Sequence, residues 1–78
     1  MIIEVKGFFV GHKIPSSDRR LGGDKWNLPE GTTVAEVLKM FNLEESVQIT
    51  LVNGNYTNKD RVLNEGDVLH ISPLVTGG

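Results

Sequence analysis

One amphipathic helix limits the folds open to this chain more than any other feature. Thr33 and Glu36 have the spacing of a capping box, in which the threonine hydroxyl accepts from a first-turn amide and the glutamate reaches back to the threonine N–H. The apolar residues behind this cap recur at i, i+3, i+4 and i+7, as Val34, Val37, Leu38 and Phe41. They form a single apolar stripe, which Asn42 can end. A helix with one such stripe buries it against one face of a sheet.

Alternation of apolar and polar residues predicts strands on both sides of this helix. The predicted strands are residues 2–9, 25–28, 47–52 and 68–72, with a further short strand within residues 55–61. In the first strand Ile3, Val5 and Gly7 share one face. Ile2 and Phe8 belong to the polar parity and are expected to be exposed.

The other strands carry the same kind of pattern. Residues 47–52 divide into two alternating sets, Val47, Ile49 and Leu51 against Gln48, Thr50 and Val52. Leu69 and Ile71 face the core from the last strand, whereas Val68, His70 and Ser72 share the opposite parity. The only tryptophan, Trp26, is expected to anchor the core or an edge.

Turn and loop signals separate the strands. Asn53-Gly54 indicates a hairpin, because both residue types tolerate a positive φ. Residues 10–24 form a connection of a length that is often functional or mobile. This connection carries residues that could suggest catalysis but are also usual loop formers, namely His12, Ser16, Ser17 and Asp18. Pro73 has no N–H, so regular pairing of the last strand should end there.

The order strand, strand, helix, strand, short strand, strand predicts an α+β fold of the β-grasp kind. We expect a mixed sheet of four to five strands, with the helix packed across one face and an extended C-terminal tail. Residues 1–73 would form this domain, and residues 74–78 a flexible tail.

Composition excludes several classes of function. The chain has 78 residues, enough for one domain, and its net charge of −2 with scattered basic residues argues against nucleic-acid binding. It has no cysteine, which excludes disulfides, thiolate metal sites and thiol nucleophiles. No apolar run could span a membrane, and the first residues lack the pattern of a secretion signal, so we expect a cytoplasmic protein.

Motifs for independent catalysis are not visible in the sequence. We find no phosphate-binding loop, no metal-ligand spacing and no ordered nucleophile–base pair. We therefore expect a protein that is not an enzyme, with no metal and no bound cofactor. Chemistry could instead reside in the terminal Gly77-Gly78, because a tail without side chains can pass through a narrow channel and present its carboxylate. Small residues are also common at fraying ends.

Four stretches in the same order resemble the MoaD/ThiS family of ubiquitin-like sulfur carriers. They are residues 28–38, 52–54, 62–68 and 71–78, which together span most of the chain. The resemblance implies that a MoeB/ThiF-like partner, related to ubiquitin-activating enzymes, consumes ATP to adenylylate the carboxyl of Gly78. A sulfur donor would then displace AMP and leave a thiocarboxylate. The residues expected to contact partners are Pro73, Leu74, Val75, Thr76 and Gly77.

The resemblance suggests two pathways that could receive the sulfur. The closing run and the long first loop are closer to MoaD, the small subunit of molybdopterin synthase, but Leu74 stands where that branch often has a second proline. The linker at residues 42–46 is also shorter than is usual there. Our first choice is molybdenum or tungsten cofactor synthesis, with the large subunit of molybdopterin synthase as recipient. Thiamine synthesis, with thiazole synthase, is the second.

Two other functions remain open at this point. The chain could modify proteins through Gly78, or it could be a plain β-grasp interaction module in which the diglycine is incidental. A carrier also needs a second contact surface, since two glycines bury little area. We expect that surface on the exposed sheet face near the last strand, where Val68, His70 and Ser72 share a parity.

Overall fold

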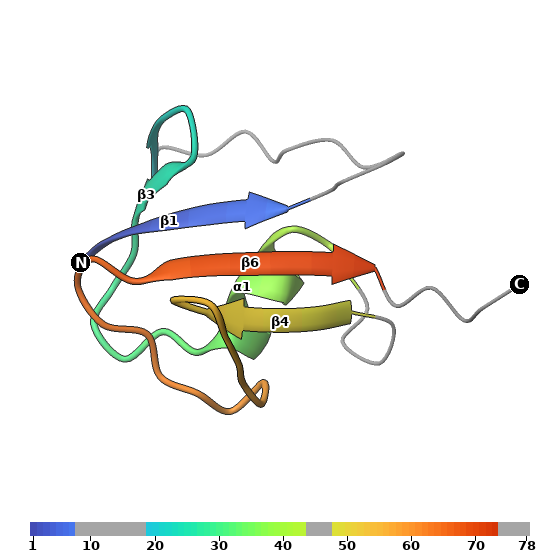
Figure 1. Ribbon diagram of the computed structural model, residues 1–78. Coiled ribbons are helices and arrows are strands. Elements are labelled where there is room, and N and C mark those ends of the chain that lie inside the picture. The colour runs from blue at the N-terminus through green and yellow to red at the C-terminus, as the bar shows by residue number, and fades with distance from the viewer. Residues whose placement is uncertain (8–18, 44–47, 74–78) are drawn as a thin grey trace, which may run out of the picture.

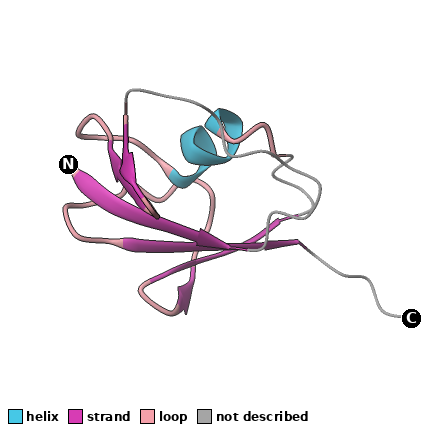
Figure 2. Cartoon of the chain, turned by 90° about the horizontal axis from the view of Figure 1, so that it is seen from above, coloured by secondary structure: helices cyan, strands magenta, loops and turns pink. Residues whose placement is uncertain are grey.

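The computed structural model describes residues 1–7, 19–43 and 48–73. Within them the elements are β1 (Ile2–Gly7), β2 (Arg20–Gly22), β3 (Lys25–Asn27), α1 (Val34–Met40), β4 (Gln48–Val52), β5 (Asn55–Tyr56) and β6 (Val68–Pro73). The strands form one sheet in the order β2-β3-β1-β6-β4-β5 (Figure 1). β1 and β6 pair in parallel, and every other pair is antiparallel. Helix α1 covers one face of this mixed sheet (Figure 2), which confirms the expected α+β fold.

The sheet has six strands, one more than the largest number expected, and the added strand is β2. Its residues were expected to belong to the long connection at residues 10–24. β2 has only three residues, all exposed, and its register with β3 shifts between Arg20 and Gly22. Gly22 and Gly23 both have positive φ, 114° and 55°, and reverse the chain into β3. Three exposed residues carry no alternation that a sequence could reveal.

The core lies between α1 and the sheet. It contains Ile3, Val5, Trp26, Leu28, Val34, Val37, Leu38, Phe41, Leu43, Val52, Leu63, Leu69 and Ile71. Trp26 is 1% exposed, and its ring centroid lies 5.1 Å from that of Phe41 at a tilt of 53°. This aromatic pair joins β3 to the end of the helix and confirms the expected anchoring role of Trp26. Ile2 is 42% exposed, as its parity predicts.

The helix cap follows the capping-box spacing with one difference. The Glu36 amide donates to Thr33 Oγ1 at 3.2 Å, as expected. The Glu36 carboxylate, however, accepts from the Thr33 hydroxyl at 3.3 Å, where the sequence predicted a bond to the Thr33 N–H. Other first-turn amides bond outside the helix, Val34 N to Arg61 O and Ala35 N to Lys59 O. The segment before Leu63 therefore shares the capping of the helix. After the C-cap, Asn42 adopts a left-handed φ of 58°.

The register of β4 decides which of its two faces meets the core. Thr50 and Val52 are buried, at 2% and 1% exposure, whereas Ile49 and Leu51 are half-buried on the other face. The buried residues pair with Ile71 and Leu69 of β6, so they point toward the helix. The Thr50 hydroxyl donates to the Thr57 carbonyl at 3.1 Å, which satisfies a polar group inside the core. The set richer in apolar residues thus faces away from the core.

The end of β6 and the β4–β5 hairpin can be compared with the expected strand ends. β6 continues through Pro73, which pairs with Gln48, so the strand is one residue longer than predicted. The hairpin at Asn53-Gly54 is confirmed, with φ of 53° and 86°, the two positive values of a type I′ turn. Phe8, Val47, the proposed tail at 74–78 and the loop residues 10–18 lie outside the described residues.

Truncation of the helix stripe tests this core. Leu38→Ala removes a side chain with no exposed surface and should lower the free energy of unfolding by about 2–5 kcal/mol, because a cavity remains. The matched Leu21→Ala removes the same atoms from a side chain that is 52% exposed, and should change stability by less than about 1 kcal/mol. Urea unfolding of both variants measures the difference. Equal losses would contradict the assigned core.

Candidate functional site

The described part of the candidate site is β6, the strand that leads to the C-terminal residues. β6 lies in the middle of the sheet, with β1 on one side and β4 on the other. Near its end, Gly7 pairs with Ile71, and Ile49 and Gln48 pair with Ser72 and Pro73. The strand is therefore paired along both edges as far as Ile71 and along the β4 edge through Pro73, so the backbone of Pro73 has a fixed position.

Lys59 supports the end of β4 that lies beside Pro73. Its ammonium donates to the carbonyl of Gln48 at 2.9 Å, and Gln48 is the residue that pairs with Pro73. Further along, Thr57 N donates to Thr50 O at 3.1 Å. These bonds occupy carbonyls along the outer edge of β4, which β5 is too short to cover.

The face of the sheet away from α1 carries an apolar patch. Leu51 pairs with both Tyr56 and His70, and Ile49 pairs with Ser72. Residues directly opposite one another in a sheet share a face, so these side chains lie together. We call this group the open sheet face, and it consists of Ile49, Leu51, Tyr56, Val68, His70 and Ser72. Tyr56, a member of this group, is 80% exposed.

Charged residues border the open sheet face along β1. Lys6 pairs with His70, and Glu4 pairs with Val68, so both charged residues lie on the neighbouring strand β1, directly beside members of the open sheet face. Both are half-buried, and His70 is exposed, as the sequence predicted. An apolar centre with a charged margin is the usual composition of a protein docking surface.

The structure extends the surface that the sequence predicted. Val68, His70 and Ser72 lie together on β6 as expected, whereas Ile49, Leu51 and Tyr56 were missed. The available signal was the apolar set at alternate positions of residues 47–52. Its orientation depends on the pairing of β4 with β6, which sequence alternation alone does not give. The side chain of Pro73 and the residues Leu74, Val75, Thr76, Gly77 and Gly78 lie outside what the structure describes, so their contact with partners stays a prediction.

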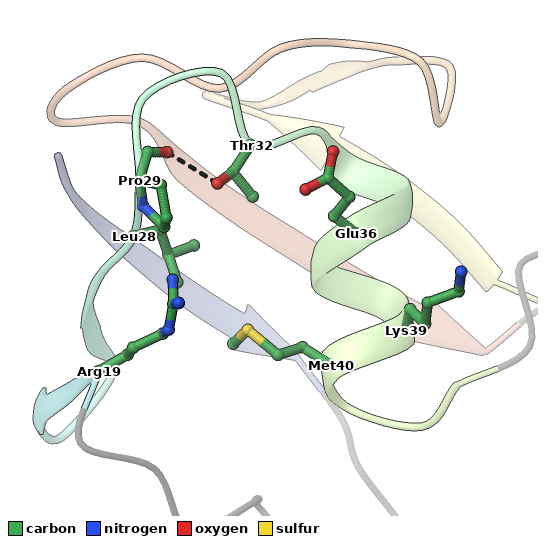
Figure 3. A pocket seen from close by; sticks show the side chains of 7 residues that line it. All are labelled: Arg19, Leu28, Pro29, Thr32, Glu36, Lys39 and Met40. Atoms are coloured by element: carbon green, nitrogen blue, oxygen red, sulfur yellow. Dashed lines mark hydrogen bonds between the residues drawn. The ribbon is translucent and has the colours of Figure 1, made fainter.

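A concave region lies on the helix side of the molecule (Figure 3). It is a hollow of about 460 Å³, lined by Arg19, Leu28, Pro29, Thr32, Glu36, Lys39 and Met40. The Thr32 hydroxyl donates to the Pro29 carbonyl at 2.7 Å, and the Glu36 carboxylate accepts from Thr33. These two polar groups therefore serve the local fold, and the hollow shows no nucleophile paired with a base.

The same described ranges offer neither a metal-ligand cluster nor a membrane-spanning helix. Within residues 1–7, 19–43 and 48–73, no three His, Cys, Asp or Glu side chains are grouped so that they could hold a metal ion. In those parts of the chain no helix combines the length and the apolar character needed to cross a membrane.

A match to a known protein family identifies the kind of protein to which the sheet and the C-terminal residues belong. The model of the ThiS family matches residues 13–78, which include β6 and the terminal diglycine. The chain belongs to the ThiS family. ThiS-family proteins are sulfur carriers and not enzymes, they hold no bound cofactor, and they act with an activating partner of the ThiF/MoeB type. No curated protein matches this ThiS-family chain.

Proposed function

We propose that this protein carries sulfur as a thiocarboxylate on Gly78, for the synthesis of molybdopterin or, as second choice, of thiamine. The observation that carries the proposal is the ThiS-family match, which extends through Gly78. The fixed position of Pro73 at the end of a central strand supports it, because the reactive end group then starts from a defined place. Recipients would be the large subunit of molybdopterin synthase in the first case and thiazole synthase in the second.

The chemistry takes place at one end group. A carboxylate is a poor acyl donor, because it has no good leaving group. In the partner's nucleotide site, an oxygen of the Gly78 carboxylate attacks the α-phosphorus of ATP, and pyrophosphate leaves. A sulfur nucleophile at the oxidation level of sulfide then attacks the carbonyl carbon, so that the C–S bond forms, the C–O bond to AMP breaks, and AMP leaves with that oxygen. The carrier supplies the acyl group, and the partner supplies the catalytic groups.

The open sheet face provides the affinity that the tail cannot. Fixing four residues of a tail in one conformation costs roughly 4–8 kcal/mol of backbone entropy, and glycines recover little of this by burial. Leu51, Tyr56 and Val68 offer apolar area on three neighbouring strands, β4, β5 and β6, and β6 is the strand that ends at Pro73. A partner that covers this face while it receives the tail can offset the ordering cost. Both contacts would then depend on β6.

The first experiment measures the product directly. The protein is incubated with an activating enzyme of the ThiF/MoeB type, ATP and a sulfur donor, and its intact mass is recorded. We expect the mass increase that corresponds to replacement of one oxygen by sulfur. A variant without Gly77 and Gly78 should show no change. If a partner that is active on its own carrier leaves the full chain unmodified, the proposal is wrong.

The second experiment tests the docking surface. Tyr56→Ala should raise the Kd for the activating enzyme roughly tenfold, because exposed aromatic side chains that become buried dominate many interfaces. The substitution should not alter the fold, since Tyr56 is 80% exposed. Val62→Ala is the matched control, because Val62 is 49% exposed but pairs with Thr33 beside the helix. Titration calorimetry measures the Kd of both variants. An equal change in Kd for the two substitutions would exclude the open sheet face as the surface that binds the enzyme.

A further inference from the structure

Two turns are joined at the start of β6 by a side-chain bridge. Asn53 Nδ2 donates to Asp67 Oδ1 at 2.9 Å, and Val68 N donates to Asn53 Oδ1 at 3.0 Å. The other carboxylate oxygen, Asp67 Oδ2, accepts from Asn64 N at 2.8 Å. We call the pair Asn53 and Asp67 the clasp. It connects the β4–β5 hairpin to the turn before β6, and the Asp67 residue is 7% exposed.

The asparagine of the clasp also has the most reactive sequence context in the chain. Of the asparagines, at positions 27, 42, 53, 55, 58 and 64, only Asn53 precedes glycine. Gly54 has no Cβ to hinder the approach of its backbone nitrogen to the Asn53 side-chain carbon. Attack of that nitrogen forms a five-membered succinimide, as the N–H proton goes to solvent and the side-chain nitrogen leaves as ammonia. Water then opens the ring to aspartate or isoaspartate.

The folded structure opposes this reaction. Both polar atoms of the Asn53 side chain are held by hydrogen bonds, so the amide cannot turn toward Gly54 N without breaking them. The backbone adds a second restraint, because Asn53 N donates to Val68 O at 2.9 Å. Reaction therefore requires local opening of the hairpin, and its rate follows the population of the opened form.

We propose that Asn53 is a deamidation site, that the clasp protects it in the folded protein, and that the product cannot re-form the clasp. A carboxylate at position 53 has no N–H to donate, and it would face Asp67 Oδ1 at the distance of the present hydrogen bond. Two carboxylates at this distance repel each other, and Asp67 is largely buried. The reaction is irreversible under the same conditions, since ammonia is lost. Because Leu51 and Tyr56 flank this hairpin, its opening also disturbs the open sheet face.

A time course in mildly alkaline buffer tests the protection. Peptide mass spectrometry follows conversion at each asparagine in the folded protein and in urea. We expect Asn53 to convert before the other asparagines in both states. Its rate of conversion in the folded protein should be about tenfold or more below its rate in urea. Asp67→Asn should accelerate conversion of Asn53 in the folded state about tenfold, because the bridge loses an acceptor. Asp60→Asn is the matched control, with Asp60 exposed and outside the clasp, and should not change the rate.

Two outcomes of this time course would overturn the proposal. One is a rate of conversion at Asn53 in the folded protein that equals its rate in urea. The other is a rate at Asn53 that Asp67→Asn leaves unchanged. Neither depends on sulfur transfer, so the proposal fails or stands separately from the carrier function.

Stability of designed variants tests the effect of the product. Asn53→Asp should lower Tm by about 5–15 °C, since it removes the donor and places two carboxylates together. The double variant Asn53→Asp with Asp67→Asn exchanges donor and acceptor across the bridge. The amide introduced at position 67 can donate to the new carboxylate and still accept from Asn64 N. We expect it to recover at least half of the lost Tm. A double variant no more stable than Asn53→Asp alone would contradict the role of the clasp.

Discussion

The pairing of β6 along both of its edges is the constraint on which the rest of the structure depends. It bonds in parallel to β1 and antiparallel to β4, so it joins the first and last parts of the chain. Leu69 and Ile71 point from it into the core, at 0% and 1% exposure. The same strand places His70 on the opposite face and ends at Pro73. One strand therefore contributes to the core, to the open sheet face and to the position of Pro73, from which the tail begins. A loss of its pairing would affect all three.

The two faces of the sheet have different tasks because one helix can cover only one of them. The helix face is closed by the stripe on α1 and by Trp26, and its buried hydroxyl at Thr50 is satisfied internally. The other face keeps Leu51 and Tyr56 available to a partner. A small domain has little apolar surface to spare, so an apolar patch left outside the core is significant. The proposed carrier function gives that patch a use.

Signals confined to a few neighbouring residues predicted the structure well. The helix cap at Thr33 and the turn at Asn53 both form where the sequence predicts them, because the Thr33 bond to the Glu36 amide and the positive φ of two adjacent residues are local features. The orientation of β4 depends on its pairing with β6, a distant segment, which no local pattern encodes, whereas β2 is too short and too exposed to carry an alternation. For the site, the proposal of Gly78 rests on the sequence and the family match alone, whereas Leu51 and Tyr56 can be proposed only once strand register is known.

The central claim is that a partner enzyme activates the carboxyl of Gly78, and exchange of labelled pyrophosphate into ATP measures that step most directly. Adenylylation is reversible, so an activating enzyme of the ThiF/MoeB type should return label to ATP whenever a competent carrier is bound. We predict exchange that requires this protein and is absent when the chain ends at Thr76. Exchange that proceeds equally with the shortened chain, or no exchange with the full chain and an enzyme active on its own carrier, would contradict the account.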